Sequence, residues 1–173
     1  MPQLFSLVLI GAECTGKTTL ARALSEELAV PWSPEYVRQY VDTVKRPLTA
    51  EDLLPIGLGQ LAAEDAARHE AHQLVIHDTN LLSSIIYAKH YFQQSLAQIN
   101  RAFARRSYSL YALCHPDLPW QADPGQREGP ETRSLLHHKF ALELQSRKLP
   151  TLDLSGALDQ RIQLVRRAVL PLL

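Results

Sequence analysis

The segment from Gly11 to Thr19 carries the clearest chemistry in this chain. It reads G-A-E-C-T-G-K-T-T and fits the pattern G-x-x-x-x-G-K-T of a phosphate-binding loop. Gly11 and Gly16 let the backbone curl so that successive N–H groups face an anion. Lys17 directs a positive charge at the β- and γ-phosphates, and the Thr18 hydroxyl can bind Mg²⁺. We therefore expect the loop to bind ATP through Gly11, Ala12, Glu13, Cys14, Thr15, Gly16, Lys17, Thr18 and Thr19.

Asp78 is the first of two acidic residues expected beside this loop. It ends the apolar run 74–77, which is the arrangement of a Walker B acid. A carboxylate at this place can bind Mg²⁺ through water or accept a proton from an attacking hydroxyl. The structural alternative is that Asp78 caps the helix expected from Asn80. We favour the metal role, with Thr18 and Asp78 together organising Mg²⁺.

Glu35 is the second acidic residue, and it lies just past a short expected strand. Small P-loop kinases commonly place at this position an acid that orients or activates the acceptor hydroxyl. We expect Glu35 to act as the base while Asp78 organises Mg²⁺, and the swapped assignment stays open. Arg38 follows one helical turn later, where it either pairs with Glu35 or reaches the acceptor.

The segment 115–130 predicts a short irregular lid, because it holds four prolines and two glycines. Arg127 in this segment is expected to neutralise charge on the transferring phosphoryl group. Trp120 and Asp123 are candidates for holding a planar heterocycle and ribose hydroxyls. For Trp120 the alternative is a hydrophobic anchor that packs the lid against the body of the protein.

The spacing of apolar residues predicts the helices and strands that position these residues. Helical spacing favours helices over 18–28, 34–41, 49–72, 80–92, 95–105, 131–147 and a last helix from Leu158, and apolar runs favour strands over 4–10, 29–33, 74–78, 108–114 and 149–154. Pro55, Gly57 and Gly59 predict a kink or an interrupted start in the third helix. The alternation predicts an α/β fold with a five-stranded parallel sheet and helices on both faces. With the phosphate loop after the first strand, this pattern resembles P-loop kinases, which implies the strand order 2-3-1-4-5 and a short lid.

Length and composition set the remaining limits. The chain has 173 residues, which suits a single domain over 1–173, and its 18 basic and 18 acidic residues cancel. This balance argues against nucleic-acid or anionic-membrane partners, and no apolar run approaches the ~20 residues of a membrane span. Cys14 and Cys114 have neither metal-ligand spacing nor a disulfide framework, so we expect a cytoplasmic protein with small-molecule partners. Cys14 is either redox-sensitive or simply a small residue that fits the loop, and the oligomeric state stays open.

Five collinear segments resemble the ribosylnicotinamide kinase domain of NadR-type NAD-salvage proteins. They are GAECTGKTTLARAL, PEYVRQYV, GQLAAEDAA, HDTNLLSSIIYAKHYF and YALCHPDLPWQADPGQRE. The resemblance implies transfer of the ATP γ-phosphate to the 5′-hydroxyl of nicotinamide riboside. By position it implies Lys17, Glu35, Asp78 and Arg127 as catalytic residues, and Glu35, Tyr36, Arg38, Asn80, Trp120 and Asp123 around the riboside.

Two departures from the family pattern matter for this expectation. The bifunctional members carry an adenylyltransferase domain, and 173 residues leave no room for one, so we expect a stand-alone or repurposed kinase. Gly125 and Gln126 also lengthen the gap between Asp123 and Arg127. The alternative functions are a kinase for another nucleoside or small alcohol, and a regulatory P-loop ATPase that binds a protein partner.

Overall fold

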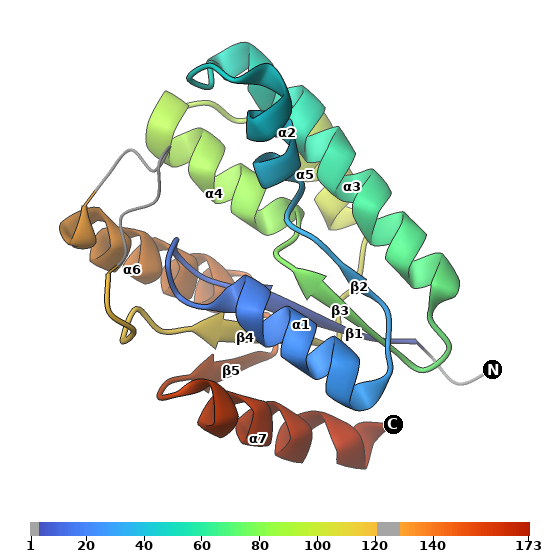
Figure 1. The fold of residues 1–173 in the computed structure, drawn as a ribbon. Coiled ribbons are helices and arrows are strands. Elements are labelled where there is room, and N and C mark those ends of the chain that lie inside the picture. Colours follow the sequence, from blue (N-terminus) through green and yellow to red (C-terminus); the bar gives the residue numbers. More distant parts are fainter. Residues whose placement is uncertain (1–3, 121–128) are drawn as a thin grey trace.

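A five-stranded, all-parallel sheet forms the centre of the protein (Figure 1). The structure is a computed structural model that describes residues 4–120 and 129–173. The strands lie in the order β2-β3-β1-β4-β5, which confirms the order expected from the sequence. Their bounds are β1 (Phe5–Ile10), β2 (Trp32–Ser33), β3 (Leu74–Asp78), β4 (Leu110–Cys114) and β5 (Thr151–Leu154).

Helices cover both faces of the sheet, as a parallel sheet requires. Their bounds are α1 (Lys17–Leu28), α2 (Tyr36–Val44), α3 (Leu53–Glu70), α4 (Leu81–Phe92), α5 (Ala97–Ala104), α6 (Pro130–Ser146) and α7 (Leu158–Val169), with 3₁₀ turns at Ala50–Asp52 and Leu170–Leu172. Among the described residues, no helix combines the length and the apolar character needed to cross a membrane.

Strand β1 separates two apolar cores. Leu7 and Leu9 pack with α1 and α7 on one face, whereas Val8 and Ile10 pack with α4, α5 and α6 on the other. This alternation follows from the two-residue period of a strand, and the four side chains are fully buried. The apolar run before the phosphate loop therefore anchors the loop in the middle of the sheet.

Helix α3 is continuous through the three residues that were expected to kink it or interrupt its start. It runs from Leu53 to Glu70 without interruption, after a 3₁₀ turn at Ala50–Asp52. Pro55 falls in the first turn, where its missing N–H has no intrahelical partner to lose. Gly57 and Gly59 serve close packing instead, because a Cβ would lie 2.5 Å from Ile99 Cδ1 at Gly57 and 2.0 Å from Tyr36 Cε1 at Gly59.

The second strand is also shorter than expected. Ala29 ends α1 in the left-handed region at φ +52°, so the chain becomes extended only later and pairs with β3 through Trp32 and Ser33. The short strand places Glu35 directly before α2, at the same end of the sheet as Asp78.

Candidate active site

The phosphate loop spans the gap between β1 and α1, at the carboxyl end of the central strand. Gly11 has φ +142°, and a Cβ there would lie 2.7 Å from the Cys114 carbonyl oxygen, so only glycine fits beside β4. Gly16 has φ +80° and forms the N-cap of α1. The buried Lys17 donates from Nζ to the carbonyl oxygens of Gly11 at 3.0 Å and Ala12 at 2.8 Å. Its ammonium group therefore lies along the loop itself.

Asp78 meets Thr18 at the start of α1. Pairing of β1 with β3 places Asp78 opposite Leu9, and the Thr18 hydroxyl donates to Asp78 Oδ2 at 2.5 Å. Burial raises the pKa of the Asp78 carboxyl to about 6, and the nearby Glu35 carboxylate adds to this rise. The second oxygen, Oδ1, is buried without a hydrogen-bond partner.

This pair of oxygens fits a magnesium ion. A hydroxyl and a carboxylate are the hard donors that Mg²⁺ prefers, and Mg²⁺ completes its shell with water and substrate phosphates. A buried, unpartnered carboxylate oxygen is costly unless a cation or a proton reaches it. Within residues 4–120 and 129–173, no group of three or more His, Cys, Asp or Glu side chains forms a closed protein cage for a metal.

Glu35 lies at the same edge and pairs with Arg38. Arg38 Nε donates to Glu35 Oε2 at 2.9 Å, so Arg38 adopts the first of the two roles considered for it. The Glu35 side chain is 13% exposed, whereas that of Arg38 is 55% exposed. Glu35 and Asp78 are close enough for the charge of Glu35 to raise the pKa of Asp78. Two acidic residues therefore meet beside the phosphate loop.

Tyr36 packs between α2 and α3. Its ring lies against Gly59, and its backbone N–H donates to Gln60 Oε1 at 2.9 Å. Its side chain is thus positioned by α3, directly after Glu35 in the chain.

Asn80, in contrast, is occupied by the fold. Its Oδ1 accepts from the Leu82 N–H at 3.1 Å, which makes it the N-cap of α4, and its Nδ2 donates to the Tyr111 hydroxyl at 3.2 Å. The side chain is fully buried, so the expected contact of Asn80 with the acceptor has no support here. The helix cap considered for Asp78 is therefore made by Asn80, two residues later.

Trp120 stacks on an arginine that the sequence had not singled out. The Arg133 guanidinium carbon lies 5.6 Å from the centre of a Trp120 ring, within cation–π range. Arg133 also donates to the carbonyl oxygens of Leu118 at 2.9 Å and Cys14 at 3.3 Å. Trp120 therefore borders a segment that is tied to the phosphate loop. Asp123 and Arg127 lie outside the described residues.

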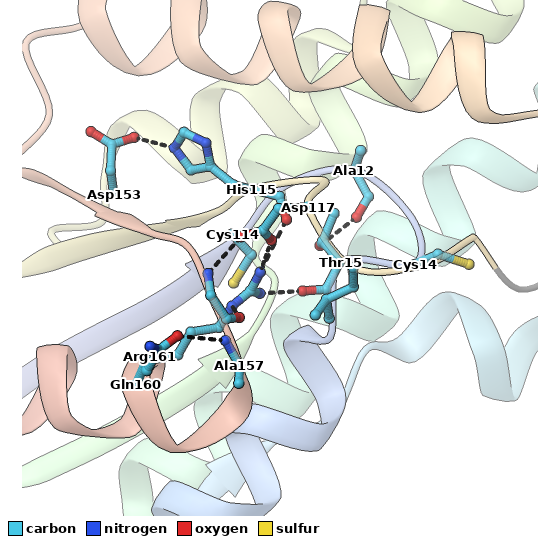
Figure 2. A network of polar contacts seen from close by, with 12 residues as sticks. Ala12, Cys14, Thr15, Cys114, His115, Asp117, Asp153, Ala157, Gln160 and Arg161 are labelled. Atoms are coloured by element: carbon cyan, nitrogen blue, oxygen red, sulfur yellow. Dashed lines mark hydrogen bonds and ion pairs between the residues drawn. The ribbon is translucent and has the colours of Figure 1, made fainter.

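Arg161 is the second arginine that sequence reasoning missed. It is 1% exposed and lies behind the phosphate loop, where it donates to the Thr15 carbonyl oxygen (Figure 2). Arg133 and Arg161 are each the fourth residue of a helix. A positive charge near a helix N-terminus is opposed by the helix dipole, and this unfavourable placement was the available signal.

The chain is similar to several known proteins. The sequence matches the family described as an AAA domain over residues 6–161. No curated protein matches the chain. Among solved structures, a NadR protein in complex with NR superposes with a TM-score of 0.82 at 24% identity, covering 95% of this chain and 51% of that chain. A NadR protein in complex with NAD and AMP-PNP superposes at 0.80 and 22% identity, covering 95% and 49%.

Other matches include nucleoside and nucleotide kinases. Thymidylate kinase from Candida albicans superposes with a TM-score of 0.71 at 16% identity, covering 98% of this chain and 92% of that chain. Deoxyadenosine kinase from M. mycoides reaches 0.68 at 13% identity, covering 96% and 100%. The fold is therefore that of P-loop nucleoside and nucleotide kinases, and the chain spans about half the length of the NadR structures.

Proposed function

The chain belongs to the AAA domain family, and we propose that it is an ATP-dependent kinase that phosphorylates the 5′-hydroxyl of nicotinamide riboside. One observation carries the proposal: Thr18 and the half-unsatisfied carboxylate of Asp78 meet beside Lys17 and within electrostatic reach of Glu35. This combination provides a cation site, a phosphate cradle and an acid for an acceptor hydroxyl.

The loop and Lys17 hold the triphosphate in this proposal. Backbone N–H groups of the loop and the N-terminus of α1 face the phosphates. Lys17 leaves the carbonyl oxygens of Gly11 and Ala12 and moves to the β- and γ-phosphate oxygens, which attract the ammonium group more strongly. Thr18 and Asp78 would hold Mg²⁺, which would supply positive charge beside the phosphate oxygens.

Glu35 then acts on the acceptor. Its carboxylate orients the 5′-hydroxyl and accepts the proton as the hydroxyl oxygen bonds to the γ-phosphorus and the bond from phosphorus to the β–γ bridging oxygen breaks. Arg38 holds the Glu35 carboxylate in place through their 2.9 Å contact. Arg127, as the lid arginine, supplies charge to the transferring group.

The choice of nicotinamide riboside rests on two supports. The first is the resemblance of five collinear sequence segments to the NadR kinase domain. The second is the superposition on a NadR protein bound to NR over 95% of this chain. In the proposal, Tyr36 and Trp120 supply the aromatic surface for the planar pyridine ring, and the enzyme works in the cytoplasm. The role proposed for Asp123 is to bind the ribose.

ADP release with a panel of nucleosides tests the proposal. Nicotinamide riboside should give the highest kcat/KM, and mass spectrometry should identify its 5′-monophosphate. Faster turnover of deoxyadenosine or thymidine would instead favour the second candidate, a kinase for another nucleoside, to which the deoxyadenosine kinase match points. ATP hydrolysis that needs a partner protein and no acceptor would contradict both.

A further inference from the structure

Arg161 is a charged side chain buried behind the phosphate loop. It is among the largest fully buried side chains of the protein, at 1% exposure. Burial of a guanidinium group costs several kcal/mol unless hydrogen bonds compensate it. The guanidinium group must therefore be hydrogen-bonded to well-placed acceptors, and it fixes the positions of those acceptors in turn.

The acceptors of Arg161 come from three separate segments. Nε donates to the Gly156 carbonyl oxygen at 2.9 Å, and one terminal nitrogen donates to Thr15 at 2.5 Å. The other terminal nitrogen donates to the His115 carbonyl oxygen at 3.2 Å and contacts the Asp117 carboxylate. Figure 2 shows the guanidinium between the phosphate loop, the segment after β4 and the start of α7.

Asp117 closes this network. Its other oxygen accepts from the Gly156 N–H at 2.5 Å, so the same carboxylate holds both Arg161 and the loop after β5. Burial opposes ionisation of Asp117, but the Gly156 N–H and the Arg161 charge keep its pKa below the ordinary value. The guanidinium thus stays paired at neutral pH.

The contact with Thr15 has a consequence for phosphate binding. In a trans peptide the C=O and the next N–H point in opposite directions. Arg161 holds the Thr15 carbonyl on the side of α7, so the Gly16 N–H points to the opposite side, which is the concave side of a phosphate loop. Gly16 itself packs against this region, because a Cβ there would lie 2.9 Å from Leu118 Cδ1 and 3.8 Å from an Arg161 nitrogen.

The preceding peptide is held in the same way. Arg133 donates to the Cys14 carbonyl oxygen at 3.3 Å, which directs the Thr15 N–H inward by the same geometry. The Thr15 hydroxyl braces the loop from within through its 2.8 Å bond to the Ala12 carbonyl. Arg161 is the more buried of the two external arginines and the one with contacts to three segments.

We propose that Arg161 is a positioning residue that orients the Thr15–Gly16 peptide for the triphosphate and ties it to the segments after β4 and β5. The inference rests on the proposed function only in requiring that the loop binds a triphosphate. Preorganised N–H donors bind an anion without reorganisation, so loosening this peptide weakens phosphate binding while the fold persists.

Binding measurements test this role separately from kinase activity. Isothermal titration calorimetry with Mg²⁺ would measure Kd for AMP-PNP and for inorganic tripolyphosphate on wild type, Arg161→Gln and Arg161→Lys. We expect Arg161→Gln to weaken both ligands by about tenfold or more, as losses of supporting contacts often do, with Arg161→Lys in between. Arg166→Gln is the matched control, since Arg166 lies on the same helix in a half-exposed pair with Glu27, and its Kd values should stay at the wild-type level.

A second readout separates positioning from stability. A purely structural role would lower the melting temperature of Arg161→Gln and leave the affinity of the folded protein unchanged. In ¹H–¹⁵N spectra, tripolyphosphate should shift the Gly16 amide strongly in wild type and in Arg166→Gln, and weakly in the Arg161 variants. If Arg161→Gln does not fold, the affinities and amide shifts of Arg161→Lys are compared with those of wild type instead.

Three outcomes decide between the proposals. Wild-type affinity for tripolyphosphate in a folded Arg161 variant would overturn the positioning role, and so would a wild-type protein that binds neither ligand. Tight AMP-PNP binding without phosphorylation of nicotinamide riboside would remove the proposed function and leave the role of Arg161 standing.

Discussion

The Thr18 hydroxyl donates to Asp78 Oδ2 at 2.5 Å, which joins the first turn of α1 to the end of β3. The two residues are separated by 60 positions in the chain and meet because β1 and β3 are neighbours in the sheet. This contact leaves Asp78 Oδ1 buried and without a hydrogen-bond partner. A cation bound by this oxygen would lie between the protein and the phosphates. The following predictions start from that arrangement.

Asp78 should make the stability of the protein depend on pH. Its carboxyl has a pKa of about 6 in the folded chain against 3.8 as the ordinary value, mainly because of burial. The unfolded chain therefore loses this proton at lower pH, so stability falls as the pH rises from about 4 and levels off above about 6. The loss amounts to about 3 kcal/mol, since each tenfold difference in proton affinity is worth about 1.4 kcal/mol.

Urea unfolding of wild type and Asp78→Asn in Mg²⁺-free buffer from pH 4 to 8 checks this value. In Asp78→Asn, the free energy of unfolding should not show the fall that titration of Asp78 causes in wild type. At pH 7.5, Mg²⁺ should raise the melting temperature of wild type and not that of the variant. An equal decline in both proteins would show that Asp78 is not the titrating group.

Lys17→Ala should reduce turnover by about 10²–10³-fold, because Lys17 supplies the loop's charge to the phosphates. Circular dichroism should show an intact fold, since the two hydrogen bonds that Lys17 Nζ makes go to carbonyl oxygens of the loop, Gly11 and Ala12. Steady-state kinetics with ATP checks the loss, and Lys89→Ala on the exposed side of α4 serves as the control. Near-normal activity would refute the role given to Lys17.

Gly59→Ala should weaken acceptor binding through Tyr36. The new Cβ would lie 2.0 Å from Tyr36 Cε1, so the ring must move, although alanine favours a helix by up to about 1 kcal/mol. We expect KM for the acceptor to rise and KM for ATP to stay unchanged.

The Tyr36→Ala background provides the control for Gly59. Without the ring, Gly59→Ala should have little further effect on KM for the acceptor, and a double-mutant cycle measures this coupling. Additive effects of the two changes would mean that the glycine acts by another route.

Trp120→Ala should weaken acceptor binding with little change for ATP. Trp120→Phe keeps an aromatic face for Arg133 and should retain more of the affinity. Fluorescence titration with the acceptor compares the variants. Unchanged acceptor affinity in Trp120→Ala would assign the side chain to packing of the segment around Leu118.

Arg127→Ala should lower kcat more than it raises KM for ATP, because the charge that Arg127 meets develops in the transition state. The exposed Arg105 offers a control substitution outside the site. A change confined to KM would instead indicate a contact with bound ATP in the ground state.

Local sequence patterns determined much of the fold and part of the site. The apolar run before Gly11 predicted the central strand, and the apolar run 74–77 predicted that Asp78 lies at a strand end. Both features depend on neighbours in the chain, and the sheet order agrees with the prediction.

Only the tertiary structure revealed that the phosphate loop is held from outside. Arg161 lies 146 positions from Thr15 and Arg133 lies 119 positions from Cys14. Their placement near a helix N-terminus marks them as unusual, but no local pattern identifies the loop carbonyl that each one holds. The same holds for Gly57 and Gly59, which read as helix breakers in sequence but accommodate Ile99 and Tyr36 in the fold. The periodicity of a sequence shows which face of a helix or strand is apolar. Which residue pairs with a buried charge, or which side chain packs against a glycine, depends on how elements distant in the chain pack together.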